Sequence, residues 1–125
     1  MNAKILIVDD SGLARRMTRQ ILEELGYTVE EADDGATALE RYVITHPDAV
    51  ILDMVMHGMY GLDVLIKLKE LNSKLPVIIV TADIQKSTRE QVRAAGAAAV
   101  IHKPIKREDL GSILTTVLSG GIAWN

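Results

Sequence analysis

The stretch Ile5-Leu6-Ile7-Val8-Asp9-Asp10 joins four consecutive aliphatic residues to two acids. Three later runs are apolar in the same continuous way, namely Ala49 to Leu52, Val77 to Val80 and Ala98 to Ile101. A strand that is covered on both faces, as in a parallel sheet, gives a continuous apolar run, whereas a half-exposed strand alternates apolar and polar residues. The four runs therefore predict four strands of a parallel sheet.

A fifth strand and five helices complete the predicted pattern. Tyr27 to Ala32 contains two glutamates and suits a strand at the edge of the sheet. Between the strands, apolar residues recur at helical spacing. The expected apolar stripes are Leu13, Met17, Ile21, Leu22 and Leu25, with Gly26 ending that helix; Ala36, Leu39, Tyr42 and Val43; Leu62, Leu65, Leu68 and Leu71; Val92 with the alanines of Ser87 to Ala95; and Leu110, Ile113, Leu114, Val117 and Leu118. Repeated strand–helix alternation predicts an α/β fold, a three-layer αβα sandwich with right-handed crossovers.

The length and composition fit one domain with an aliphatic core. The chain has 125 residues, of which 48% are hydrophobic, with no Phe and no Cys. A chain of this size buries enough surface for a stable core without crosslinks. We expect a domain over residues 1–119 and a tail over residues 120–125, whose Trp124 either docks on the domain or is loose.

Charge and hydropathy restrict the expected partners and location. The net charge of −3 gives no general attraction for nucleic acid. Only four strongly apolar residues precede Asp9, so we expect no signal peptide. No apolar run approaches the roughly 20 residues that span a bilayer. The sequence predicts a soluble, cytoplasmic protein that binds neither nucleic acid nor a membrane directly.

Polar residues follow four of the five predicted strands. Asp9 and Asp10 follow the first apolar run, Asp53 follows the run that starts at Ala49, Thr81 follows Val80, and Lys103 comes soon after Ile101. The carboxyl ends of parallel strands share one edge, where open α/β sheets bind their ligands. The sequence therefore predicts that three carboxylates, a hydroxyl and an ammonium converge.

Such a cluster requires compensation for its negative charge. Two carboxylates about 4 Å apart repel each other by about 4 kcal/mol at an effective dielectric near 20. Three hard oxygen donors suit Mg²⁺, with Mn²⁺ as an alternative, better than zinc. A carboxylate beside such an ion can act as a nucleophile toward phosphorus, and an ammonium and a hydroxyl can hold phosphoryl oxygens. Taken singly, Asp9, Asp10 and Ser11 could simply cap a helix, and Lys103-Pro104 could form an ordinary turn.

In these residues the sequence resembles the response-regulator receiver family, and most closely its stand-alone, chemotaxis-type members. The matching motifs are Asp9-Asp10-Ser11, Asp53, Thr81-Ala82 and Lys103-Pro104, and the resemblance extends over residues 3–119. It implies a flavodoxin-like sheet of five parallel strands in the order 2-1-3-4-5. It also implies a two-component signalling switch rather than an enzyme, one that only acquires and loses its own phosphoryl group.

The resemblance implies a role for each matching residue. Asp53 would accept the phosphoryl group from a histidine kinase or a histidine phosphotransfer protein. Asp10, Asp53 and the backbone carbonyl of Val55 would bind Mg²⁺, and Asp9 would hold the ion through water. Thr81 and Lys103 would contact the phosphoryl group. Ala82, beside Thr81, and a cis peptide bond before Pro104 would complete the site. A downstream protein would bind the face formed by the fourth helix, fifth strand and fifth helix.

Several residues depart from the family pattern. Val100 stands where the family usually has an aromatic switch residue, which leaves open a receiver-like binding module that works without phosphorylation. His57 replaces a proline that the family usually carries. His46, His57 and His102 are interpreted as solvated residues rather than as metal ligands. Val55 and Asp83 occupy the two positions that tune the lifetime of the phosphorylated state in the family, and we expect Asp83→Ala to change that lifetime.

Two further classes of protein fit the sequence less well than the receiver family does. Phosphatases of the haloacid dehalogenase type carry Asp-x-Asp after the first strand and a cap domain, whereas Asp9 and Asp10 are adjacent here and the chain is short. Flavodoxin-like electron carriers need a Ser/Thr/Gly phosphate cradle after the first strand, which this sequence lacks.

Overall fold

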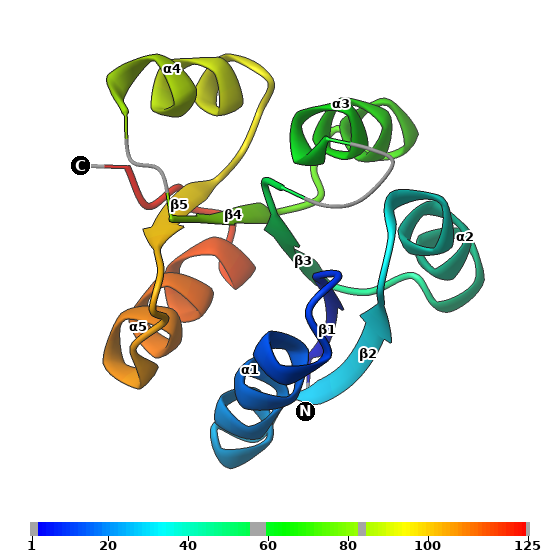
Figure 1. Ribbon diagram of the computed structural model, residues 1–125, viewed down its shortest axis with the longest axis vertical. Coiled ribbons are helices and arrows are strands. Elements are labelled where there is room, and N and C mark those ends of the chain that lie inside the picture. Colours follow the sequence, from blue (N-terminus) through cyan, green and yellow to red (C-terminus); the bar gives the residue numbers. More distant parts are fainter. Residues whose placement is uncertain (1–2, 56–59, 83–84, 125) are drawn as a thin grey trace.

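The structure is a computed structural model that describes residues 3–55, 60–82 and 85–124. These residues form a parallel sheet in the order β2-β1-β3-β4-β5 (Figure 1). The strands are β1 (Lys4–Val8), β2 (Thr28–Ala32), β3 (Ala49–Asp53), β4 (Val77–Thr81) and β5 (Ala99–His102). The predicted strand order is confirmed, and the glutamate-containing strand β2 does lie at an edge.

Helices cover both faces of the sheet. They are α1 (Gly12–Glu24), α2 (Gly35–Thr45), α3 (Gly61–Leu71), α4 (Lys86–Ala94) and α5 (Arg107–Leu118). Helices α1 and α5 lie on one face, and α2, α3 and α4 lie on the other (Figure 1). The predicted three-layer αβα sandwich is therefore confirmed.

Each strand contributes to two hydrophobic cores because its side chains alternate between the faces of the sheet. In β1, Leu6 and Val8 pack on the side of α2, α3 and α4, while Ile5 and Ile7 pack on the side of α1 and α5. All four side chains are at most 1% exposed. Complete burial of one such side chain contributes roughly 1.5–3 kcal/mol. The continuous apolar runs reflect this burial on both faces.

The exposed surface of α1 corrects one sequence-based expectation. Leu13 and Met17 belong to the predicted apolar stripe, yet they are 64% and 59% exposed. Thr18 and Leu22 are the buried residues of this helix. They are four residues apart and so share the face that rests on the sheet, and Leu13 and Met17 fall outside that face. Four residues predicted for the apolar stripes of other helices are exposed as well, namely Ala36, Val43, Leu71 and Ala94.

The ends of α1 and the packing of α4 agree with their predictions. Gly26 adopts a φ of 95°, a backbone conformation that favours glycine and ends the helix. Helix α4 buries only Val92, as its sparse apolar pattern indicated. Of the helices that the structure describes, none is long and apolar enough to cross a bilayer.

The residues after α5 settle the question about the tail in favour of docking. The indole Nε1 of Trp124 donates a hydrogen bond of 3.0 Å to the Ala97 carbonyl oxygen. Trp124 is half-buried. The division into a domain over residues 1–119 and a tail over 120–125 remains a prediction, and Asn125 lies outside the described residues.

Candidate functional site

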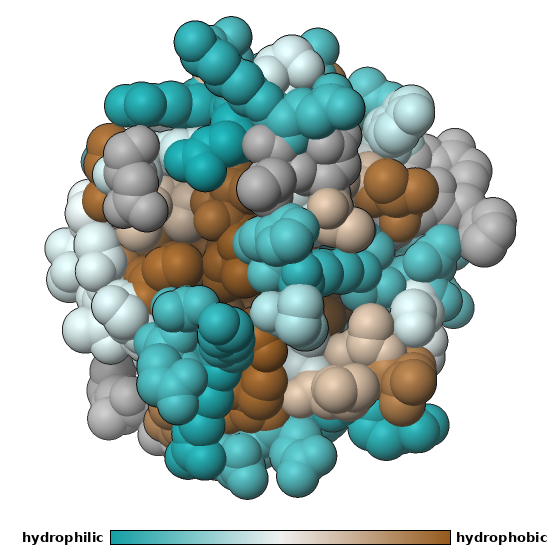
Figure 2. All heavy atoms as spheres, turned by 60° about the vertical axis from the view of Figure 1, so that its left-hand side comes forward, coloured by the Kyte–Doolittle hydropathy of each residue, from teal (hydrophilic) through white to brown (hydrophobic). Residues whose placement is uncertain are grey.

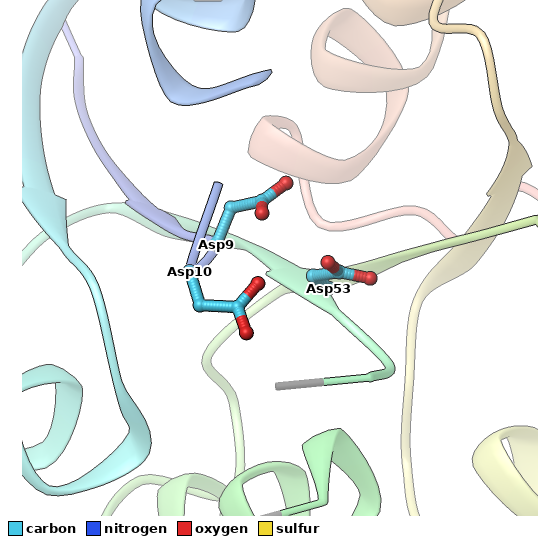
Figure 3. Close-up of side chains that lie close together, drawn as sticks. All are labelled: Asp9, Asp10 and Asp53. Carbon is cyan, nitrogen blue, oxygen red and sulfur yellow. The ribbon is translucent and has the colours of Figure 1, made fainter. Parts of the chain in front are cut away.

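Three carboxylates converge beyond the ends of two neighbouring strands (Figure 3). Asp9 and Asp10 follow β1, and Asp53 is the last residue of β3. Val8 pairs with Leu52 in the parallel register, so the acids that come next in each strand emerge side by side. One oxygen from each of the three lies within 4.8 Å of the others. Asp9 and Asp53 are each only 7% exposed, and Asp10 is half-buried.

Lys103 brings a positive charge into this acidic cluster. Its Nζ lies 3.2 Å from Asp53 Oδ2 and 3.6 Å from Asp9 Oδ2. Burial disfavours its charged form, but the attraction of Asp53 and Asp9 is larger and raises the pKa of Lys103. The Lys103-Pro104 peptide bond is cis, as predicted. An ammonium thus lies against two of the carboxylates.

The surroundings of Asp53 disfavour its ionised form despite the nearby lysine. Burial and the nearby charge of Asp9 raise the pKa of the Asp53 carboxyl. Lys103 and a hydrogen bond of 3.3 Å from the Val55 amide to Asp53 Oδ1 act in the opposite direction and only partly offset this rise. The pocket therefore favours a further cation.

The oxygen donors of the pocket fit a hard divalent ion. Carboxylates that lie within 4.8 Å of each other can share one small cation, and Mg²⁺ prefers such oxygen ligands and keeps several waters. Asp10, the most exposed of the three, leaves one side of the cluster open to solvent. The donor set thus agrees with the predicted Mg²⁺ and is equally suited to Mn²⁺.

Comparison with known proteins decides the family. The response regulator receiver domain model matches residues 5–115. The chain belongs to the response regulator receiver domain family.

Relatives and solved structures agree with this assignment. The response regulator MprA of Mycobacterium ulcerans (strain Agy99) is 39% identical over 110 residues, which are 88% of this chain and 47% of that protein. The chain thus spans about half the length of the curated relatives it matches. A CheY-like receiver from Methanospirillum hungatei JF-1 superposes with a TM-score of 0.90 at 30% identity and covers 95% of each chain. The chemotaxis protein CheY4 of Vibrio cholerae superposes with a TM-score of 0.89 at 30% identity over 94% of this chain and 99% of that one.

The ends of β4 and β5 add the remaining predicted residues of this receiver domain. Thr81 ends β4 and is 3% exposed, one residue beyond Val80, which pairs with Asp53. The Lys103 amide donates a hydrogen bond of 2.9 Å to the Thr81 carbonyl oxygen, which ties the two strand ends together. Ala82 is exposed, and its carbonyl oxygen lies 3.1 Å from His102 Nε2. Thr81 and Ala82 therefore lie at the same edge of the sheet as the acids.

The residues after β1 both cap α1 and contribute to the acidic site. Ser11 is the N-cap, and its hydroxyl accepts a hydrogen bond of 3.2 Å from the Ala14 amide. Asp9 Oδ1 accepts one of 2.9 Å from the Ser11 amide. The first turn of the helix is thus anchored to one of the carboxylates of the receiver site.

Sequence reasoning missed Gly61 as a residue of the site. A Cβ at this position would lie 2.5 Å from the Asp53 carbonyl oxygen and 2.7 Å from Met54 Cα. The Gly61 amide donates a hydrogen bond of 2.9 Å to the Met54 carbonyl oxygen. The start of α3 therefore rests directly on the backbone of Asp53. A glycine at the start of a predicted helix was the only signal in the sequence, and it did not indicate this contact.

The predicted roles of the site residues remain predictions, and two of the residues named in the sequence analysis have no described position. Asp83 and His57 lie outside the described residues. Val55 is described, with its side chain 66% exposed, but the proposed role of its carbonyl oxygen depends on an ion.

Proposed function

We propose that this receiver domain is a phosphorylation-activated switch of a two-component system in which Asp53 accepts the phosphoryl group. The observation that carries the proposal is the position of the Asp53 carboxylate, which lies between two other acids and the Lys103 ammonium. The donor would be the phosphohistidine of a histidine kinase or a histidine phosphotransfer protein. The domain changes only its own phosphorylation state and turns over no separate substrate.

The transfer makes one bond and breaks another. An oxygen of the ionised Asp53 carboxylate attacks phosphorus, and the bond from phosphorus to the histidine nitrogen breaks with its electron pair left on that nitrogen. The products are an aspartyl phosphate and a histidine that takes a proton from solvent. The Lys103 ammonium, already 3.2 Å from Asp53, is placed to neutralise a phosphoryl oxygen.

The acidic residues would hold the ion that transfer needs. In this proposal Asp10, Asp53 and the Val55 carbonyl bind Mg²⁺ directly, Asp9 holds it through water, and Mn²⁺ can replace it. A bound ion would neutralise charge on the phosphoryl oxygens. The carboxylates repel one another without the ion, and phosphorylation adds further negative charge, so the ion would be needed in both states.

The phosphoryl group would act on the rest of the domain through the ends of β4 and β5. Phosphorylation adds about −1.5 to −2 charges and three acceptor oxygens. In this proposal the Thr81 hydroxyl and Lys103 turn toward them, Ala82 and the Pro104 segment adjust, and the population shifts between two arrangements of α4, β5 and α5. A downstream protein would bind that face. Asp83 and Val55 would tune the lifetime of the phosphorylated state.

Labelling by a small phosphodonor tests the assignment of Asp53. With Mg²⁺ and acetyl phosphate, we expect the wild type to gain one phosphoryl group by mass spectrometry and Asp53→Asn to gain none. Asp63→Asn, which changes an exposed acid in the first turn of α3, is the matched control and should label like the wild type. Undiminished labelling of Asp53→Asn would assign the phosphoryl group to another residue.

Val100 favours one second candidate, a receiver-like binding module that works without phosphorylation. Its side chain is half-buried against the core and cannot swing an aromatic ring toward solvent. Beryllofluoride with Mg²⁺, which mimics the phosphoryl group on an aspartate, distinguishes the two functions. The switch requires shifts of amide NMR resonances in α4 and α5, and the binding module requires that those resonances stay in place.

A further inference from the structure

The segment after α5 crosses the edge of the sheet at β5. The Gly121 amide donates a hydrogen bond of 3.1 Å to the Thr116 carbonyl oxygen of α5, and the Ala123 amide donates one of 2.9 Å to the Ala98 carbonyl oxygen before β5. Ala123 packs against the core on the side of α1 and α5, whereas Trp124 packs against the core on the side of α4. Residues 120–124, called here the tail, therefore connect α5 to the region around α4.

The indole ring of Trp124 is held by α4 from one side and by the chain before β5 from the other. The guanidinium carbons of Arg89 and Arg93 lie 5.9 Å and 5.4 Å from the centre of the ring, within cation–π range. Nε1 is hydrogen-bonded to the Ala97 carbonyl oxygen at 3.0 Å. The three contacts fix both the position and the direction of the ring.

Helix α4 supplies two of these contacts and is itself only lightly packed on the domain. It buries only Val92, and elements with few buried contacts are the ones that move at small cost. Arg89 and Arg93 reach the tail from the same helix. The docked ring thus adds two arginine contacts to a helix whose own buried surface is small.

The tail also occupies part of the face proposed for output. Ala123 and Trp124 line a hollow of about 680 Å³ together with β5 residues such as Val100 and α5 residues such as Ile113 and Thr116. Figure 2 brings this side forward and shows a band of apolar atoms between hydrophilic side chains above and below it. A protein that binds in this hollow would therefore contact the tail as well as β5 and α5.

We propose that the tail is an intramolecular ligand of the α4–β5–α5 face, which holds α4 in the unphosphorylated arrangement and leaves when the switch is activated. The inference rests on the proposed function, because it assumes that the phosphoryl group on Asp53 changes this face. Trp124 then supplies, from the tail, the aromatic group that Val100 does not supply within β5.

The proposal predicts that docking of Trp124 and binding of a phosphoryl mimic are thermodynamically linked. If docking of Trp124 favours one arrangement of α4 and a phosphoryl mimic favours the other, each must weaken the other by the same factor. Trp124 is the only tryptophan of the chain, so its fluorescence, excited at a wavelength that tyrosine does not absorb, reports on the tail alone. Both halves of the linkage are therefore measurable without a known partner.

The experiment titrates the full chain with beryllofluoride in the presence of Mg²⁺. In the wild type we expect Trp124 emission to shift to longer wavelength and acrylamide quenching to rise on saturation. In Trp124→Ala we expect the half-saturating beryllofluoride concentration, read from the Val55 amide resonance, to fall about 5-fold, the lower end of typical couplings. Ile122→Ala, which removes a tail side chain that is 66% exposed, is the matched control and should titrate like the wild type.

The outcomes separate this inference from the proposed function. One outcome overturns the inference. The α4 and α5 resonances would shift with beryllofluoride, but the quenching of Trp124 would not change and Trp124→Ala would titrate like the wild type. The tail would then be only a structural cover. If no resonance of α4 and α5 responds at all, the proposed switch itself fails. The fluorescence measurement uses the wild type, so it decides the matter even where Trp124→Ala folds poorly.

Discussion

Lys103 Nζ lies 3.2 Å from Asp53 Oδ2 and so joins the ends of β5 and β3 across the end of β4. The Lys103 side chain is 33% exposed, whereas the Asp53 side chain is 9% exposed. It therefore partly neutralises a buried acid and at the same time faces the solvent from which a phosphodonor arrives. The same contact that stabilises the unmodified pocket positions the lysine for a phosphoryl oxygen.

Removal of the Lys103 ammonium should separate phosphorylation from response. In Lys103→Ala we expect labelling of Asp53 by acetyl phosphate to persist, because the nucleophile and the acidic residues remain. We expect the beryllofluoride-induced shifts of α4 and α5 resonances to disappear, because β5 loses its contact with the phosphoryl site. Lys67→Ala, which changes an exposed lysine of α3, should retain both. Complete loss of labelling in Lys103→Ala would show instead that the lysine is needed for transfer.

Asp53→Asn should stabilise the domain in the absence of a divalent ion. The pKa of Asp53 is raised by burial and by Asp9, so its ionisation costs more in the folded than in the unfolded state. The cost is absent below the usual aspartate pKa of 3.8 and is fully present once the pH exceeds the raised pKa. At pH 7 with a chelator we expect a Tm about 4 °C higher for Asp53→Asn, equivalent to about 1 kcal/mol.

Mg²⁺ and acid should both abolish the difference in Tm between the wild type and Asp53→Asn. Addition of Mg²⁺ should raise the Tm of the wild type more than that of Asp53→Asn, since a ligand that binds only the folded state stabilises it. Near pH 3.5 the two proteins should melt together. A lower Tm for Asp53→Asn at pH 7 would mean that the Lys103 ion pair outweighs the burial and repulsion of this carboxylate.

Gly61→Ala should displace the backbone of Asp53, although the two residues are separated in the sequence. The added methyl group would meet the backbone of Asp53 and Met54 at 2.5 Å and 2.7 Å, where no flexible side chain can give way. We expect a loss of about 2–3 kcal/mol in the free energy of unfolding, typical of overpacking, and slower labelling of Asp53. Gly12→Ala is the control, because its Cβ would meet only Arg15 at 3.8 Å, an ordinary contact. Equal stability of the two variants in urea unfolding would contradict the close approach.

The sequence predicted the sheet and the acidic site because both depend on short, local patterns. The run Ile5 to Val8 is buried on both faces, and the acids after it emerge where parallel strands end. Helix faces were predicted less well. An apolar stripe shows that a helix is amphipathic, but which of its residues contact the sheet depends on the rotation of the helix, and this placed Leu13 at the surface and Thr18 inside.

Contacts between distant backbones were beyond prediction for a different reason. Gly61 touches the Asp53 carbonyl, and Trp124 bonds to the Ala97 carbonyl, and both contacts involve main-chain atoms that carry no sequence signature. The identity of one partner alone could not indicate either contact. Only the path of the chain in space brings these pairs together.

Glu31, in the edge strand β2, should make part of the free energy of unfolding dependent on pH. Hydrogen bonding from Arg19 first, and then from Arg15, lowers the pKa of Glu31 despite partial burial. A lowered pKa means that the ionised form stabilises the fold above the usual value of 4.5, and that this contribution is lost as the pH falls below it. Because these side chains are 20% to 39% exposed, we expect Glu31→Gln to cost less than about 1 kcal/mol at pH 7. Urea unfolding at pH 7 and pH 3.5 measures this cost, which should be smaller at the lower pH. Glu30→Gln in the same strand controls for the loss of one negative charge, and an equal pH dependence of the two variants would show that the arginine contacts contribute nothing specific.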